Sequence, residues 1–188
     1  QLTNKSRIGA LLVSALFVFV GITAPAHAQG TNTVSATDAF FVTQAMIGNM
    51  AEISTSQVAV QLSQDPDVQN YAQQLIDDHT ASLSQLVQMA DTQNIALSDC
   101  LSQTPVSVPQ TNVTPDAKFD FVYLTTQVQL HNMAISLYTT EAVLGQNADL
   151  RAYARAQLPA LRQHLREARA LLRQTSTGGT STGNGARR

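Results

Sequence analysis

Three histidines and one glutamate are the residues of this chain whose types and positions could support chemistry. His79, His131 and His164 each fall on or beside the apolar stripe of a different predicted helix, and Glu52 lies on a fourth. A buried ring nitrogen needs a partner, because an unpaired buried polar group costs about 1–3 kcal/mol. Imidazole nitrogens and a carboxylate together suit Zn²⁺, Fe²⁺, Mn²⁺ or Cu²⁺. These four residues are therefore candidate metal ligands, and Asp78, next to His79, is either a fifth ligand or an outer partner of one.

Four long helical segments must position these side chains. Each begins at a capping residue or a proline and repeats apolar residues at helical spacing. The segments are predicted to start near Ser35 or Thr37, at Asp65-Pro66, after Thr114-Pro115-Asp116 and at about Ala148, and to end before Ser63, near Asn94, at Gly145 and near Arg173. The apolar stripe of the second contains Val68, Ala72, Leu75, Ile76, Leu83, Leu86 and Val87, and that of the third contains Phe121, Leu124, Val128, Ile135, Tyr138 and Ala142.

The predicted fold class is all-α, a four-helix bundle over residues 37–173 made of two hairpins. Short turns join the helices of each hairpin, so these helices are antiparallel neighbours. Residues 95–115 hold Pro105, Pro109 and Pro115 among many small polar residues, which predicts a long loop between the hairpins.

Helix geometry places the four candidate ligands at similar heights. Glu52 and His79 each lie about 20 Å from the turn at Asp65, and His131 and His164 each lie about 25 Å from the turn after Gly145. If the helices run up-down-up-down, both turns lie at the same end and the four groups share one layer.

A structural alternative stays open at this point. The histidines could form a buried polar layer that is hydrogen-bonded to Glu52, Gln127 or Thr55 and that fixes the helix register. Nearer the hairpin end, Glu141, Arg155, Tyr138 and Tyr153 are candidates for a second polar cluster held by an ordinary ion pair.

The first 28 residues have the pattern of a secretory signal peptide. Lys5 and Arg7 precede an apolar run from 8 to 20, and Ala26-His27-Ala28 follows as a small-residue cleavage site. Residues 29–36 form a polar linker and residues 174–188 a Gly/Ser/Thr tail that we expect to be disordered. We therefore expect an exported protein in the periplasm, or associated with the outer membrane, of a Gram-negative-type bacterium.

Composition narrows the expected partners. The formal net charge of the 188 residues is −2, which favours neither nucleic acid nor an anionic membrane as a partner, so membrane contact is expected only through the signal peptide before cleavage. Cys100 is the single cysteine and is predicted to lie in the long loop, so no internal disulfide can form.

Four pieces of the chain resemble an exported, ferritin-like bacterial family called domain of unknown function 4142. They are Phe41 to Glu52, Val68 to His79, Phe119 to His131, and the run Leu158-Pro159-Ala160-Leu161-Arg162-Gln163-His164-Leu165. With the helices between them, the resemblance covers about residues 37–173. It implies an exported four-helix bundle and no established reaction.

The wider ferritin-like comparison separates this chain from the di-iron proteins. Those carry a Glu-x-x-His pair on each of two helices. The residues three before His79, His131 and His164 are all apolar: Ile76, Val128 and Leu161. A mononuclear site or none is therefore more consistent than ferroxidase chemistry.

These observations predict a non-enzymatic exported bundle that binds one metal ion in its core or serves in envelope stress protection. The sequence shows no nucleophile beside a base, no phosphate loop and no nucleotide motif. The alternatives are a mononuclear metalloenzyme that uses the same residues, and a bundle that binds haem between two facing histidines.

Overall fold

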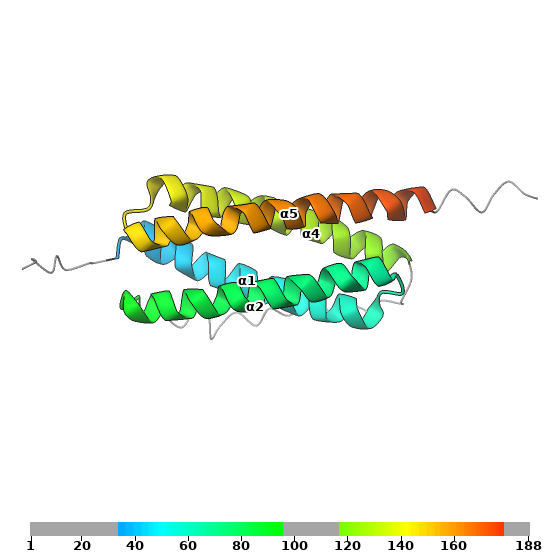
Figure 1. The fold of residues 1–188 in the computed structure, drawn as a ribbon, viewed down its shortest axis with the longest axis horizontal. Helices are drawn as coiled ribbons and strands as arrows, with labels where there is room; N and C mark the ends of the chain where they lie inside the picture. Colours follow the sequence, from blue (N-terminus) through cyan, green and yellow to red (C-terminus); the bar gives the residue numbers. More distant parts are fainter. Residues whose placement is uncertain (1–33, 96–116, 179–188) are drawn as a thin grey trace, which may run out of the picture. The chain divides into compact units, whose positions relative to one another are not determined.

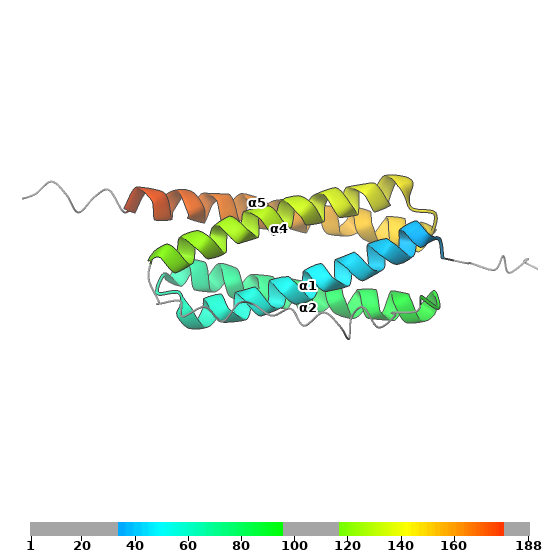
Figure 2. The same cartoon turned by 180° about the vertical axis from the view of Figure 1, so that it is seen from behind.

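The computed structural model describes residues 34–95 and 117–178, and it contains four long helices (Figures 1 and 2). They are α1 (Ala36–Leu62), α2 (Pro66–Thr92), α4 (Ala117–Leu144) and α5 (Ala148–Gly178). No strand occurs in these two ranges, so the predicted all-α four-helix bundle is confirmed. Within the same ranges, no helix is both long and apolar enough to cross a membrane.

Several predictions concern residues that lie outside the described ranges. These are the signal peptide, most of the linker, the loop with Cys100, and residues 179–188. The tail was predicted to begin at residue 174, but α5 continues to Gly178. Leu171 and Leu172 pack against the core, and the Thr175 hydroxyl donates to the Leu172 carbonyl, so the last turn of α5 has both apolar and polar support.

The predicted caps start the first two helices. Ser35 accepts a hydrogen bond from the Asp38 backbone N–H at 3.1 Å, and the Asp38 carboxylate accepts one from the Ser35 N–H at 3.2 Å. This reciprocal pair satisfies donors that a helix start leaves unpaired. Asp65 accepts from the Asp67 N–H, and Pro66 occupies the first helical position.

The two hairpin turns lie at opposite ends of the bundle. Asp38, at the start of α1, accepts a hydrogen bond from the Gln146 N–H at 2.8 Å, and Gln93, at the end of α2, accepts one from the Asn147 side chain at 2.8 Å. The α4–α5 turn therefore sits where α1 begins and α2 ends, and α2 and α4 run in the same direction (Figure 1). The antiparallel pairing within each hairpin is as predicted, whereas the condition that both turns lie at the same end is not met. Periodicity specifies which face of a helix is buried, and a long connection permits either direction for the helix that follows.

The core consists of two apolar clusters, one toward each end of the bundle. One gathers around Phe41, whose ring packs edge-on against Tyr138 with centroids 5.0 Å apart. The other gathers around Leu75 and Tyr123. On each of the helices α2, α4 and α5, the histidine lies between the residues of one cluster and those of the other.

Two predicted core residues lie on the surface instead. Phe121 is 48% exposed and Val87 is 45% exposed. Near the start of α4 the buried aromatic residues are Phe119 and Tyr123, which stack with centroids 6.2 Å apart. The Tyr123 hydroxyl is 3.0 Å from the Ser56 hydroxyl of α1, and this buried hydrogen bond turns the helix toward α1.

The residues predicted to form a second polar cluster contact other partners than each other. Arg155 donates to the Ala142 carbonyl at 2.7 Å instead of pairing with Glu141. Glu141 is buried and faces Asp38, and desolvation with this neighbouring carboxylate raises the pKa of Glu141 to about 7. Tyr138 and Tyr153 belong to the aromatic cluster around Phe41.

We expect Gly145→Ala to destabilise the bundle by about 1–3 kcal/mol, as overpacking does. A Cβ at this position would contact the Glu141 carboxyl and would lie 2.7 Å from the Glu141 carbonyl oxygen. Gly48→Ala is the matched control, because a Cβ there meets nothing within 4 Å and alanine favours helix by about 0.5–1 kcal/mol. Urea unfolding of the two variants should shift in opposite directions, and equal shifts would contradict the close approach at Gly145.

Candidate metal centre

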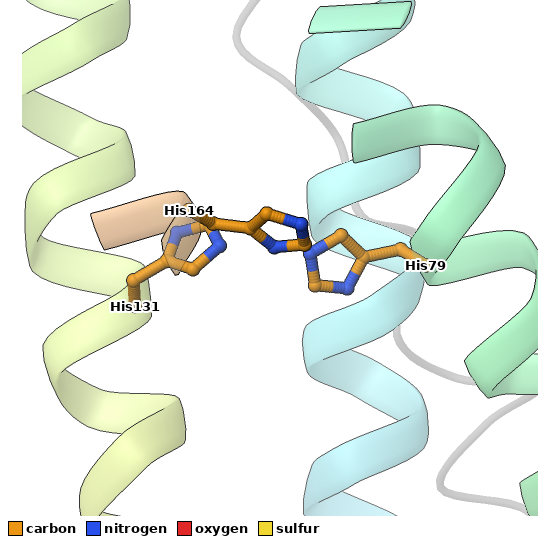
Figure 3. Close-up of side chains that lie close together, drawn as sticks. All are labelled: His79, His131 and His164. Carbon is orange, nitrogen blue, oxygen red and sulfur yellow. The ribbon is translucent and has the colours of Figure 1, made fainter. Parts of the chain in front are cut away.

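Three of the five predicted ligands meet in the middle of the bundle. His79 of α2, His131 of α4 and His164 of α5 turn their rings toward one another (Figure 3). Each offers one nitrogen, and these nitrogens all lie within 4.8 Å of one another. The side chains are nearly closed to solvent, with exposed fractions of 6%, 0% and 3%.

The histidines meet although the two hairpin turns lie at opposite ends of the bundle. α1 and α2 have 27 residues each, which is about 40 Å of helix. A group about 20 Å from one end of such a helix is also about 20 Å from the other. Reversing a hairpin therefore leaves a mid-helix group at nearly the same height.

An asparagine orients His79. The Nδ1 atom of His79 is 2.8 Å from the Asn49 side-chain oxygen of α1. The Asn49 NH₂ group donates to the Ala45 carbonyl at 2.7 Å, so its oxygen is the atom that faces the ring. Nδ1 of His79 must then carry the proton, and Nε2 is left with a free lone pair.

The other two rings are oriented by acceptors as well. His131 Nδ1 donates to the Gln127 backbone carbonyl at 2.9 Å, one helical turn earlier. His164 Nε2 donates to the Asp78 carboxylate of α2 at 2.9 Å. Each acceptor selects one tautomer of the neutral ring, with the proton on His131 Nδ1 and on His164 Nε2.

The three remaining nitrogens have no hydrogen-bond partner among the described residues. They are His79 Nε2, His131 Nε2 and His164 Nδ1, and all three are buried. Since all three are acceptors, they cannot hydrogen-bond to one another. One water molecule in their midst could donate to only two of them, whereas one metal ion would accept lone pairs from all three.

Burial keeps at least two of these rings neutral. Desolvation, with the neighbouring His131 and His164, lowers the pKa of His79 to about 3. Desolvation and His164 lower the pKa of His131 to about 4, against the Gln127 carbonyl, which raises it. Neutral imidazole is the form that ligates metals, so at neutral pH no proton has to leave these rings.

Glu52 and Asp78 lie behind the histidines instead of among the converging nitrogens. A carboxylate oxygen of Glu52 is 3.4 Å from His131 Nδ1, the nitrogen that faces away from the cluster. Asp78 likewise contacts the outer nitrogen of His164. Burial raises the pKa of Glu52 to about 8, against a hydrogen bond from Gln127 that lowers it. The structure therefore presents both carboxyl groups as outer partners and three histidines as the inner set.

Asn49 is the site residue that sequence analysis missed. It lies three residues before Glu52 and is buried. It is the one polar side chain in the otherwise apolar and small run 45–51, and this could have marked it. The role of Gln127 had no such marker, because its backbone carbonyl holds His131 while its side chain donates to the Thr55 hydroxyl at 3.2 Å.

The three converging histidines suit one small metal ion better than haem. A tetrahedral Zn²⁺ with Zn–N bonds of about 2.0–2.1 Å separates its ligand nitrogens by about 3.3 Å. Rotation about the side-chain bonds can close the rings to that separation, and three nitrogens leave a fourth position open. The ring centroids are only 5.3–5.6 Å apart in all three pairs, so the third ring occupies the space beside any two that a porphyrin would need.

We expect Asp78→Ala to weaken metal binding about 10- to 100-fold, as losses of outer partners do. The variant leaves His164 free to adopt the other tautomer. Asp77→Ala is the matched control, because this adjacent aspartate is exposed and accepts a hydrogen bond from Gln73 of its own helix. Competition titration with a chelator measures both affinities, and equal affinities would show that Asp78 does not orient the site.

Comparison with known proteins identifies a family and no function. No curated protein and no solved structure gives a significant match to the chain. A family model described as a domain of unknown function (DUF4142) matches residues 23–171. Because this match covers most of the 188 residues, and the resemblance in the four helical pieces agrees with it, the chain belongs to the DUF4142 family.

Proposed function

We propose that this chain is an exported four-helix bundle that binds one divalent transition-metal ion between His79, His131 and His164. One observation carries the proposal: three buried imidazoles converge, and each has one nitrogen held by an acceptor and the other without a partner. Zn²⁺, Cu²⁺ and Fe²⁺ all accept imidazole. Export rests on the signal peptide pattern of residues 1–28.

The arrangement favours the binding of a metal ion over the catalysis of a reaction. The three histidines are buried in the middle of the bundle. The two carboxyl groups behind them contact the histidine rings. A protein that keeps a metal ion out of solution in this way suits a storage or protective role in the cell envelope.

A mononuclear metalloenzyme is the second candidate, and Glu52 favours it. One oxygen of this buried carboxyl group is without a partner. Three histidines leave a coordination position for water, which a bound metal ion would make acidic. A bound cation would favour the ionised form of Glu52, which could then serve as a proton acceptor in the site.

Metal analysis of the exported chain, purified without a metal-affinity tag, tests the proposal. We expect about one transition-metal ion per chain, removable by a chelator and restored by titration. Loading the stripped chain with Co²⁺ then separates the candidates: a four-coordinate spectrum that changes with added anions indicates an open position, and an unchanged spectrum indicates a closed one. A chain that binds none of Zn²⁺, Cu²⁺, Fe²⁺ or Co²⁺ would leave the histidines as a polar layer.

A further inference from the structure

Two rows of hydrogen bonds join α2 to α5, and the rows differ in their exposure to solvent. The inner row is buried: the Tyr71 hydroxyl donates to the His164 carbonyl at 3.2 Å, and the Tyr153 hydroxyl lies 2.7 Å from the Ser82 hydroxyl. The outer row has one exposed residue in each of its three side-chain pairs. These pairs are Asp78 with His164 at 2.9 Å, Gln85 with Gln157 at 3.3 Å, and Gln93 with Asp149 at 3.3 Å. One ligand of the candidate metal centre therefore belongs to the outer row.

The boundary between α2 and α5, which we call the α2–α5 seam, is the least closely packed of the four boundaries between neighbouring helices. The two helices of each hairpin pack much more extensively against each other. A boundary with few packed residues and solvent-accessible hydrogen bonds opens locally at a low cost in free energy, because water can replace those hydrogen bonds. The bundle should therefore open at this seam before either hairpin comes apart.

Pro159 weakens α5 beside the seam. It lies within the helix, two residues after Gln157 and five before His164. Proline has no backbone N–H, so the Arg155 carbonyl receives no hydrogen bond from the residue four positions later. Helices bend most readily at such a point. α5 can therefore bend near His164 at a step where no backbone hydrogen bond has to break.

Asp78 is the outer partner that connects the histidines with solvent. Its side chain is 51% exposed, whereas the His164 side chain that it contacts is 3% exposed. The outer partners of the other two rings, Asn49 and Gln127, are only 4% and 0% exposed. A cation that approaches from solvent therefore meets an accessible carboxylate at His164 and buried groups behind the other two rings.

We propose that a metal ion enters and leaves the histidine site through the α2–α5 seam, with Asp78 as the carboxylate that binds it first. This inference rests on the proposed function, because it concerns access to the same site. Carboxylate oxygens bind divalent transition metals, and a negative charge at an opening raises the local concentration of cations. Asp78 thus has two roles, since it also orients the His164 ring.

His164 is the ligand that moves. An ion at Asp78 competes for the oxygen that accepts the hydrogen bond from His164 Nε2. Once that bond is broken, rotation of the ring about its Cβ–Cγ bond turns Nδ1, which has a free lone pair, toward the ion. The reverse rotation brings Nδ1 and the ion to the nitrogens of His79 and His131. No proton has to move, because Nε2 keeps its hydrogen throughout.

Cross-linking the seam tests the route. Gln85→Cys/Gln157→Cys in a Cys100→Ser background places two thiols on the outer row, and a short bismaleimide joins them. We expect the cross-link to slow Zn²⁺ release to a chromophoric chelator by on the order of tenfold, because it restricts local opening. The same variant blocked with N-ethylmaleimide should release Zn²⁺ at the unaltered rate. Asn132→Cys/Arg169→Cys is the matched control, because this exposed pair joins α4 to α5 at 3.4 Å, and its cross-link should not slow release.

Asp78→Asn tests the role of the first carboxylate. Asparagine keeps an oxygen that can accept from His164 Nε2 and removes the negative charge. We expect Zn²⁺ association, measured by stopped flow, to slow about tenfold, and release not to accelerate. Asp77→Asn removes an equal charge from the adjacent exposed position and should change the association rate far less.

Two results would overturn the inference and leave the proposed function standing. One is a Zn²⁺-binding chain in which the seam cross-link slows release no more than the α4–α5 cross-link does. The other is an Asp78→Asn chain with unaltered association and faster release, which would make Asp78 only a support for the His164 ring. A chain that binds no metal ion would instead contradict the proposed function and this inference together.

Discussion

A chain carrying His79→Ala and His131→Ala is expected to retain no transition metal under conditions in which the unaltered chain retains about one ion. Two of the three converging nitrogens are then gone, and one neutral imidazole holds a divalent ion weakly. Since losing an outer partner alone costs about 10- to 100-fold, losing two ligands should weaken binding by well over 100-fold. Elemental analysis after dialysis, with chelator competition for the dissociation constant, measures this.

The controls separate a lost ligand from a damaged fold. Thr80→Ala and Asn132→Ala change exposed neighbours of two ligands and should leave binding intact. His79→Leu removes the unpaired acceptor Nε2 but also leaves the buried Asn49 oxygen without its donor, so the two effects oppose each other and the metal-free bundle should change little in stability. If His79→Leu instead lowers stability and the unaltered chain binds no metal, the histidines form a structural polar layer.

Glu52→Gln is expected to stabilise the metal-free chain at pH 8 by on the order of 3 kcal/mol and to change little at pH 4.5. Burial raises the pKa of Glu52 from 4.5 to about 8. The folded chain therefore holds a proton that the unfolded chain releases above pH 4.5. Stability is lost as pH rises toward the folded pKa, and glutamine, which does not titrate, escapes this loss.

Urea midpoints from pH 4.5 to 8, measured with a chelator present, check the prediction. Asp91→Asn controls for removing a charge from an exposed position. Midpoints for Glu52→Gln that match the unaltered chain at pH 8 would contradict a neutral buried carboxyl group. Adding metal should shrink the advantage of glutamine, because a bound cation favours the ionised carboxylate beside it.

The histidines act on stability with the opposite sign. The pKa values of His79 and His131 are lowered from 6.5 to about 3 and 4, so the unfolded chain binds protons first as pH falls below 6.5. Between pH 4.5 and 6.5 this loss opposes the gain from Glu52 and Glu141. The unaltered chain should therefore change little in this window, and only the single variants reveal each contribution.

Local pattern predicted a large part of this molecule. Caps, prolines and apolar spacing specify four helices and two hairpins because they act within a few residues of the chain. The three histidines were found for the same reason: each lies on an apolar stripe near the middle of its helix, and mid-helix groups share a layer whichever way a hairpin points. The family resemblance rested on these same segments and agrees with the family model.

Contacts between helices determine the direction of α4, the histidine tautomers and the place of Glu52. The direction of α4 depends on where Asp38 meets Gln146, more than one hundred residues along the chain. The tautomers of the rings depend on Asn49, Asp78 and a backbone carbonyl, and no residue spacing reports which nitrogen these acceptors will face. Glu52 shares the height of the histidines, but its rotation about α1 places it behind His131. Sequence periodicity determines which side of a helix faces the core, whereas the neighbour that side meets is set by packing among all four helices at once.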